Sequence, residues 1–330
     1  MRCRRWSQTA SARTAEPGVY DGKIAMGQGR VTDTSSRNMT TPRPTAPPPA
    51  PERVYDRRSL TYANSFDSFW TRNTIKAMEW LTGKATIIRR VRQFEKMGEV
   101  KGQAFWPATM KVMGIDLQTP QHQLDRIPTE GPVVLVANHP HGLVDGMILA
   151  DLIGRRRLDY RILTRALLTG LDESAARYMI PVPFPHEPDA QEKMLRMRAN
   201  AMEHLEQKGL IALFPSGTVA VSETMTGPAI EGEWNVFTAK MIRKSGATII
   251  PCFFTGSNSR WYQVANRISP TLRQGLLIHE VVHSFDKPQA PIIGNPITPD
   301  QWEDRIGKPR AFMSWLRART LSLRDDPDQL

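Results

Sequence analysis

The pattern of apolar and polar residues changes character near residue 130. Beyond this point, short runs rich in β-branched residues alternate with longer segments of helical periodicity. The pattern predicts strands at 133–137, 160–163, 210–214 and 248–254, and helices at 146–153, 189–208 and 235–245. Strands that alternate with helices are typical of an α/β domain, in which helices flank a largely parallel sheet. In such folds, ligands bind at the carboxyl ends of the strands.

A basic segment with helical periodicity precedes this domain. Its apolar residues are Ile75, Met78, Leu81, Ile87, Ile88, Val91 and Phe94, its cations are Lys76, Lys84, Arg89, Arg90 and Arg92, and its aromatic residues are Phe66, Phe69, Trp70 and Trp80. We expect two amphipathic helices with a break near Gly83. They either pack on the domain with a solvated charged face or lie in an anionic membrane interface, where each cation adds about 1 kcal/mol.

The first 52 residues lack hydrophobic periodicity and end in a Pro-rich stretch, so we expect a disordered tail. We divide the chain into this tail at 1–52, a basic amphipathic membrane-interface segment at 53–101 and an α/β domain at 102–330. Residues 1–101 hold 19 Lys or Arg and 9 Asp or Glu, which gives +10 of the total net charge of +11. Such a segment attracts polyanions, and the aromatic residues among its cations favour an anionic membrane surface over nucleic acid.

Composition excludes several other classes of protein. The 330 residues are 40% hydrophobic and 23% charged, which is enough for a sizeable core. No run approaches the ~20 apolar residues that cross a bilayer, and no apolar segment follows the basic first residues as in a secretory signal. Two cysteines, Cys3 and Cys252, cannot build a disulfide framework or a Cys-based zinc site. We expect a cytoplasmic protein bound peripherally to the inner face of the membrane.

A polar block follows directly after the predicted strand at 133–137. It reads Asn138-His139-Pro140-His141-Gly142-Leu143-Val144-Asp145. A carboxylate that fixes the tautomer of an imidazole leaves the other ring nitrogen free to take a proton from a substrate hydroxyl. The block therefore predicts a general base. The alternatives are that these groups cap the next helix, or that they bind a metal, since His-x-His is a common ligand spacing.

Two more polar segments follow predicted strands. Phe214-Pro215-Ser216-Gly217-Thr218 is suited to a tight loop whose backbone N–H groups and hydroxyls face a phosphate or a developing oxyanion. The strand at 248–254 leads into a polar loop that ends at Arg260, which either meets a phosphate or is an exposed loop arginine. The sequence thus predicts polar groups at the carboxyl ends of three strands.

In this order the three segments resemble the glycerolipid acyltransferase family, the lysophosphatidic acid acyltransferases. That family has an Asn-His-x4-Asp block, a Phe-Pro-Glu-Gly block and a later Val-Pro block at a strand end. The form found here has His-Pro-x-Gly-x-x-Asp, Phe-Pro-x-Gly and an Ile-Pro strand that runs into a Gly-x-Asn loop. It is most similar to the bacterial hemolysin-like lysophospholipid acyltransferase branch, over roughly residues 58–300.

The resemblance implies roles for individual residues. His139 is implied as the base and Asp145 as its orienting partner, although five residues separate them rather than four. His141, separated from Asp145 by three residues, is the substitute. Ser216 stands where the family has glutamate, which puts a glycerol-phosphate acceptor in doubt. The implied substrate-binding residues are Asn138, Phe214, Pro215, Ser216, Gly217, Thr218, Arg165 and Arg260.

The implied reaction moves a fatty acyl group from an acyl-CoA or acyl-carrier-protein thioester to the hydroxyl of a lysophospholipid of the 1-acyl-glycerol-3-phosphate type. A non-glycerol acceptor, such as a lyso-ornithine lipid, is the alternative. A thioester is already activated, so the chemistry needs no covalent enzyme nucleophile, and we expect neither a metal nor a cofactor. A positioned base worth ~10² to 10⁴-fold, together with oxyanion donors, supplies much of the acceleration.

Two rival functions remain. His279-Glu280-Val281-Val282-His283 is an intact HExxH, the pattern of zinc metallopeptidases, with Glu303 as a third ligand. The pattern arises by chance in roughly one chain of this length in a hundred, and its β-branched residues suit a strand as well as a helix. A non-enzymatic adaptor at a basic membrane surface would account for the N-terminal charge but not for three polar strand ends.

Overall fold

The computed structural model describes residues 61, 63, 68–165, 173–183, 187, 189–224 and 227–328. Within them, six strands form one sheet in the order β3-β2-β4-β1-β7-β8. These strands are β1 (Val133–Ala137), β2 (Tyr160–Arg165), β3 (Met179–Val182), β4 (Leu210–Leu213), β7 (Thr248–Phe253) and β8 (Ile292–Ile293). All neighbours are parallel except β7 and β8, which confirms the predicted α/β class. The tail predicted at 1–52 lies outside the described residues.

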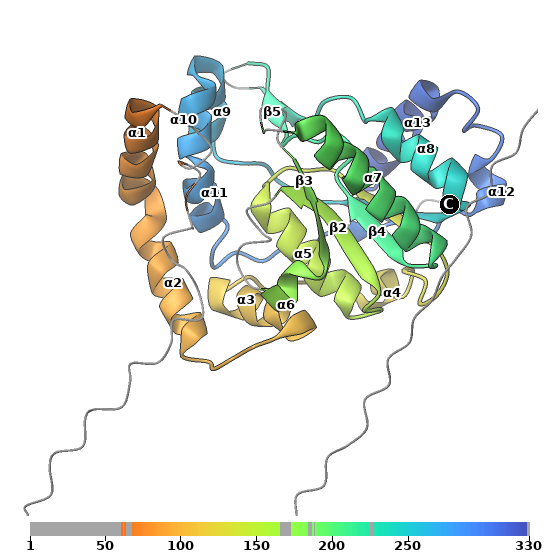
Figure 1. Ribbon diagram of the computed structural model, residues 1–330, viewed down its shortest axis with the longest axis horizontal. Helices are drawn as coiled ribbons and strands as arrows, with labels where there is room; N and C mark the ends of the chain where they lie inside the picture. Colours follow the sequence, from red (N-terminus) through yellow and green to blue (C-terminus); the bar gives the residue numbers. More distant parts are fainter. Residues whose placement is uncertain are drawn as a thin grey trace, which may run out of the picture. The chain divides into compact units, whose positions relative to one another are not determined.

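Helices cover both faces of the sheet, as Figure 1 shows. The central strand β1 is apolar throughout because both of its faces are buried. Val133, Leu135 and Ala137 pack in one core, with α3 (Phe105–Met113) and α5 (Leu143–Gly154). Val134 and Val136 pack in the opposite core, with α7 (Ala190–Glu206), α8 (Val236–Ser245) and α13 (Pro309–Ser322). Other short elements are η3 (Gly102–Ala104), α4 (Gln121–Leu124), α6 (Glu173–Ala176), α12 (Pro299–Trp302) and the antiparallel pair β5 (Val221–Ser222) and β6 (Ala229–Ile230).

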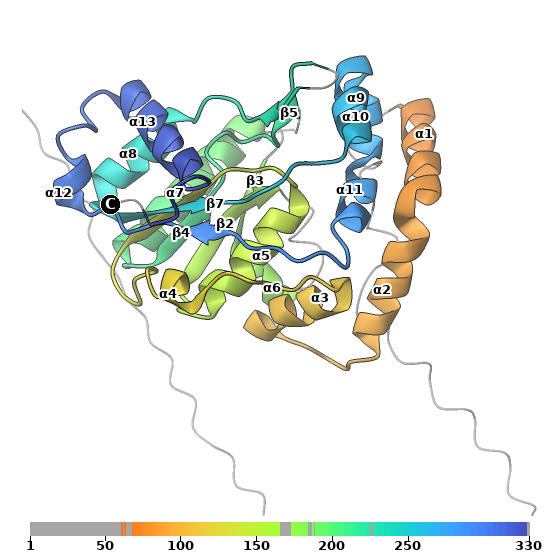
Figure 2. The same ribbon diagram turned by 180° about the vertical axis from the view of Figure 1, so that it is seen from behind.

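The basic N-terminal segment forms the two expected helices, α1 (Phe69–Glu79) and α2 (Ala85–Glu95), joined by a π-helical turn at Trp80–Lys84. Gly83 breaks the helix with a φ of 153°, a value that favours glycine. A Cβ there would lie 2.8 Å from a methyl carbon of Val282, so the turn approaches α11 (Leu277–His283) closely. The helices pack beside α10 (Pro270–Gly275), α11 and α3, along one side of the domain (Figure 2).

The apolar residues of this segment divide between the core and the surface. Ile75 and Phe94 are buried against the domain, whereas Leu81 has 87% of its surface exposed. Three aromatic side chains beside Leu81 are exposed as well: Phe69, Trp70 and Trp80. Much of the predicted apolar stripe therefore holds the helices to the domain, and a separate apolar group faces outward.

The predicted metallopeptidase pattern lies on the helix α11, and its side chains have other partners. The buried carboxylate of Glu280 accepts hydrogen bonds from the backbone N–H and the hydroxyl of Ser259, at 2.7 and 2.6 Å. Ser259 is the N-cap of α9 (Arg260–Ile268), so Glu280 fixes the start of that helix. Among the described residues, no group of three or more His, Cys, Asp or Glu is placed to hold a metal ion. Glu280 of this pattern thus has a structural role at the start of α9.

Candidate active site

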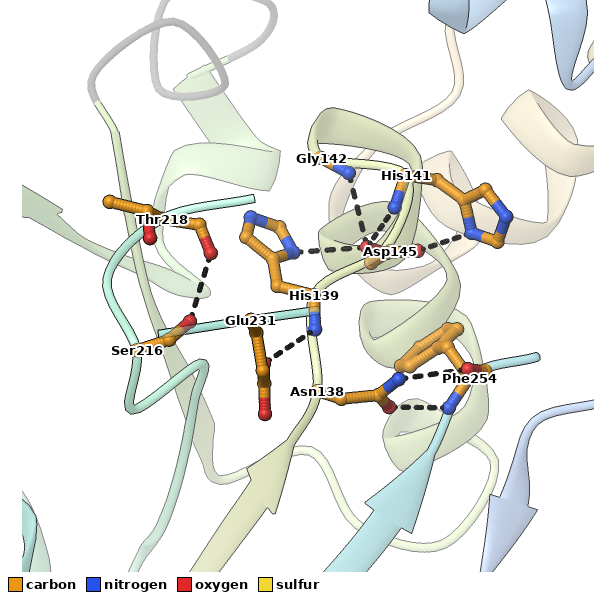
Figure 3. A network of polar contacts seen from close by, with 9 residues as sticks. All are labelled: Asn138, His139, His141, Gly142, Asp145, Ser216, Thr218, Glu231 and Phe254. Carbon is orange, nitrogen blue, oxygen red and sulfur yellow. Dashed lines mark hydrogen bonds and ion pairs between the residues drawn. The ribbon is translucent and has the colours of Figure 1, made fainter. Parts of the chain in front are cut away.

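Three chain segments meet where the adjacent strands β4, β1 and β7 end. The block at 138–145 follows β1, the loop at 214–218 follows β4, and the loop at 254–259 follows β7 and leads into α9. Because these strands are parallel neighbours, their carboxyl ends lie at the same edge of the sheet. Figure 3 shows the polar contacts that join these segments.

His139 and Asp145 form a hydrogen-bonded pair at the end of β1. The Nδ1 atom of His139 lies 3.0 Å from Oδ2 of Asp145. Asp145 is fully buried, and its carboxylate also accepts the backbone N–H groups of His141 and Gly142, at 2.9 and 3.1 Å. A carboxylate that accepts at Nδ1 leaves Nε2 of the imidazole free to accept a proton. This geometry is compatible with the predicted general base and its orienting partner.

His141 contacts the same carboxylate through its other oxygen. Its Nδ1 atom lies 3.0 Å from Oδ1 of Asp145. Burial lowers the pKa of His141, but the charge and hydrogen bond of Asp145, together with the nearby charge of Glu280, outweigh this effect and raise it above 6.5. Burial also disfavours ionisation of Asp145, yet the two histidines lower the pKa of its carboxyl to about 2. Asp145 is therefore ionised at neutral pH.

The start of α5 explains why the unusual spacing still gives contact. Gly142 has a φ of 75° and directly precedes the helix, so the chain turns sharply between the histidines and the carboxylate. Asp145 occupies the first turn of α5, where a negative charge is stabilised by the unpaired N–H groups of the helix. The predicted helix at 146–153 consequently begins earlier, at Leu143.

The loop after β4 lies against His139. The imidazole stacks on the ring of Phe214, with centroids 3.9 Å apart and an angle of 18° between the planes. The backbone N–H of Ala220 donates to the carbonyl of His139 at 2.9 Å. In Figure 3 the His139 ring projects toward Ser216 and Thr218, whereas the His141 ring projects to the opposite side of Asp145. This geometry places His139 next to the predicted oxyanion loop.

The loop itself is a tight turn whose ends are fixed. The Ser216 hydroxyl donates to the carbonyl of Thr218 at 2.9 Å, and Gly217 has a φ of 68°. Pro215 is buried and its carbonyl accepts the N–H of Asn235, while Gly217 and Thr218 are exposed. The exposed residues of this loop, Gly217 and Thr218, carry no bulky side chain.

Asn138 joins two strand ends. Its buried amide donates to the carbonyl of Phe254 at 2.9 Å, and its side-chain oxygen accepts the N–H of Phe254 at 2.7 Å. Both ends of the amide are thus engaged with the backbone that follows β7. This contact holds the first and third segments together, and substrate binding by Asn138 stays a prediction.

Two of the predicted substrate-binding residues are arginines, and they lie on different elements, α9 and β2. Arg260 is the exposed first residue of α9 and donates to the carbonyl of Gly227 at 3.2 Å. Arg165 ends β2, and its side chain lies outside the described part of the structure. Neither assignment is tested by these positions.

Sequence reasoning missed Glu231, which lies 92 residues beyond His139. Its carboxylate accepts the backbone N–H of His139 at 3.2 Å, as Figure 3 shows. Glu231 follows the short strand β6 in a segment without helical or strand periodicity, so no motif or spacing in the sequence marks it.

Comparison with known proteins identifies a family. A family model described as acyltransferase matches residues 61–286, which is more than half of the chain. Among solved structures, the chain is similar to the crystal structure of the 1-acyl-sn-glycerophosphate (LPA) acyltransferase, PlsC, from Thermotoga maritima. That match has a TM-score of 0.43 and 14% sequence identity, and it covers 76% of this chain and 88% of that chain. A search among curated proteins found no match.

Proposed function

Since the chain belongs to the acyltransferase family, we propose that it moves a fatty acyl group from an acyl-CoA or acyl-carrier-protein thioester to the hydroxyl of a lysophospholipid, with His139 as the general base. The observation that carries this proposal is the pairing of His139 with the buried carboxylate of Asp145, 3.0 Å away. That pairing leaves Nε2 of the imidazole as the proton acceptor, on the side of the loop at 214–218.

The reaction proceeds in two steps. First, Nε2 of His139 takes the proton of the acceptor hydroxyl while its oxygen attacks the thioester carbonyl carbon, which forms a tetrahedral oxyanion. The Ser216 hydroxyl and the Gly217 N–H already donate within the loop, so the Thr218 hydroxyl and the backbone N–H groups of Ser216 and Thr218 are the donors that would stabilise this negative charge. The carbon–sulfur bond then breaks, and the imidazolium returns its proton to the departing thiolate. Asp145 orients the ring and stabilises the imidazolium in between.

A non-glycerol lysolipid is the second candidate for the acyl acceptor. The residue that supports it is Ser216. The family resemblance places a glutamate at this position, whereas here a hydroxyl donates to Thr218 within the turn. An acceptor that lacks the glycerol phosphate, such as a lyso-ornithine lipid, would not need that carboxylate. The choice between these acceptors decides which lipid product forms.

Product analysis tests both candidates. Purified protein would be incubated with acyl-CoA or acyl-carrier protein and with a panel that contains lysophosphatidic acid, other lysophospholipids and lyso-ornithine lipid, and the products identified by mass spectrometry. We expect one acceptor class to be acylated by the wild type and by His279→Ala, and not by His139→Ala. Acylation of none of the acceptors with either donor would contradict the proposal.

We also propose that the protein binds an anionic membrane surface at the inner face of the membrane, through the outward side of α1 and the turn after it. Phe69, Trp70, Trp80 and Leu81 are each more than half exposed there, and Lys76 is an exposed cation among them. Aromatic and aliphatic side chains enter the headgroup boundary, and cations add attraction to anionic lipid. In the described part of the chain, none of the helices has the length and apolarity to cross a bilayer.

A further inference from the structure

Glu231 is a buried carboxylate directly behind the proposed base. It is 5% exposed, and its Oε2 atom accepts the backbone N–H of His139 at 3.2 Å. Its Oε1 atom accepts the indole N–H of Trp234 at 2.6 Å. The guanidinium of Arg317, on α13, lies 4.0 Å from the same oxygen and donates to the backbone carbonyl of Glu231 at 2.8 Å. Glu231 thus connects the residue that follows β1, His139, with Trp234 and with Arg317 of α13.

These contacts fix the backbone of His139 on both sides. Glu231 holds its N–H, and the N–H of Ala220 holds its carbonyl at 2.9 Å. Asp145 fixes the other end of the residue, at the ring. Because a displacement of about 1 Å can cost 10²-fold in rate, the anchoring of the backbone matters for a base that must meet a hydroxyl.

The contacts also determine the charge of Glu231. Burial raises the pKa of the Glu231 carboxyl above its ordinary value, and the contacts with Trp234, Arg317 and His139 offset only part of this rise. The groups that contact the two carboxylate oxygens are all donors, which suits the ionised form. The charged or titratable groups that face His139 within the described residues are Asp145 at its ring, His141 through Asp145, Glu231 at its backbone and Arg317 through Glu231.

We propose that Glu231 is a positioning residue for acyl transfer, which anchors the backbone of His139 and supplies a second negative charge that stabilises the imidazolium. The inference rests on the proposed role of His139 as the base. Asp145 acts at the ring and Glu231 acts from the backbone side, so the two carboxylates lie on different sides of the same residue. A negative charge on each side favours the imidazolium that forms when the acceptor hydroxyl loses its proton.

The test is the pH profile of kcat/KM for acyl transfer, because a purely structural role would not displace it. Glu231→Gln removes the charge and leaves one acceptor oxygen for two donors. We expect kcat to fall about 10-fold and the acid limb of the profile to move to lower pH by about half a unit or more. Glu233→Gln, at the exposed glutamate two residues away, is the matched control and should leave both unchanged.

Two further variants separate charge from geometry. Glu231→Asp keeps the charge but shortens the side chain, so kcat should fall while the acid limb stays in place. Arg317→Gln removes the neighbouring positive charge, so the acid limb should move to higher pH, the direction opposite to Glu231→Gln. This second variant keeps the inference testable if Glu231→Gln does not fold.

His139→Ala, measured in parallel, distinguishes a failure of the proposed function from a failure of the proposed role of Glu231. Substantial transfer by His139→Ala would contradict the proposed function itself. Loss of transfer in His139→Ala, combined with an acid limb that does not move in Glu231→Gln or in Arg317→Gln, would overturn the role of Glu231 alone. Thermal unfolding of each variant confirms that the rates refer to folded protein.

Discussion

The Nδ1 atom of His141 lies 3.0 Å from one oxygen of Asp145, and the Nδ1 atom of His139 lies 3.0 Å from the other. One buried carboxylate therefore orients two imidazoles, and each keeps its Nε2 atom for other partners. The two rings project to opposite sides of Asp145, and the His139 ring stacks on Phe214 beside the loop at 214–218. A Cβ on Gly256 would lie 3.0 Å from Nε2 of His141, so that ring is directed at the loop after β7.

Each oxygen of Asp145 contacts one histidine, but only the His139 ring lies beside the loop at 214–218. We therefore expect replacement of the two histidines to reduce acyl transfer unequally. His139→Ala should reduce acyl transfer by ~10² or more, because it removes the base. His141→Ala should reduce transfer by about 10-fold or less, since Asp145 keeps its contact with His139 but loses one neighbour that holds it. Steady-state kinetics with a thioester donor and a lysolipid acceptor measures both. A larger loss in His141→Ala than in His139→Ala would reverse the assignment of the base.

Asp145→Asn should impair both transfer and folding stability. The carboxylate accepts from the rings of both histidines and from two backbone N–H groups, whereas an amide offers one acceptor oxygen and a donor that faces other donors. We expect the free energy of unfolding to fall by about 1–3 kcal/mol. Urea denaturation measures this change. Asp151→Asn is the comparison variant, because Asp151 lies on the same helix and its carboxylate pairs with a more exposed side chain, that of Arg155.

The raised pKa of His141 predicts a specific dependence of stability on pH. The folded protein binds this proton more tightly than the unfolded chain, so the contribution is fully present below about 6.5 and is lost as the pH rises through the folded value. The stability difference between wild type and His141→Asn should therefore shrink as the pH is raised from about 6 to about 9. Tm measurements across this range test it, and a difference independent of pH would show that the histidine is not charged in the folded protein.

The membrane proposal predicts that changes on the outward face of α1 and on α2 release the protein from anionic vesicles. Trp70→Ser with Leu81→Ser removes exposed apolar groups, and Arg89→Glu with Arg92→Glu reverses exposed charges. Each pair should weaken sedimentation with vesicles, and binding of the wild type should decline as salt screens the charges.

Arg90 is left unchanged in this experiment because it has partners within the domain. It forms an ion pair with Asp286 at 2.5 Å and lies over the ring of Phe285. Leu158→Ser with Leu195→Ser, two exposed leucines outside the N-terminal helices, is the matched control. Equal vesicle binding by the control and by both test pairs would contradict the proposed face.

The position of Glu280 predicts a structural defect rather than a loss of metal chemistry. Glu280→Gln should lower stability by about 1–3 kcal/mol, since the start of α9 loses a charged acceptor for Ser259. His279→Ala with His283→Ala should keep substantial acyl transfer, and a chelator should not change the rate. Stoichiometric zinc in the purified wild type, together with inhibition by a chelator, would support the metallopeptidase instead.

Much of the fold follows from the sequence because its core strands are apolar on both faces. The strand predicted at 133–137 is β1 at the same bounds, and those predicted near 160, 210 and 248 are β2, β4 and β7. The helices α5, α7 and α8 also lie where periodicity placed them. The pattern did not resolve α9 or α13, nor the helical state of α11, where β-branched residues suit either structure. In the structure this segment is a helix, and its Val282 lies against the turn at Gly83.

The candidate site, too, was predictable from the sequence only in part. Local sequence determined which groups follow each strand, including His139, Asp145 and the loop at 214–218, because chain order alone places them there. Tertiary structure decided which groups meet. In the folded chain both histidines contact the carboxylate of Asp145, and Asn138 is hydrogen-bonded to the backbone of Phe254. Glu231 accepts the backbone N–H of His139, although 92 positions separate the two residues in the sequence. Periodicity reports which face of an element is buried, but the partner of a buried polar group depends on the packing of distant elements, which no local pattern encodes.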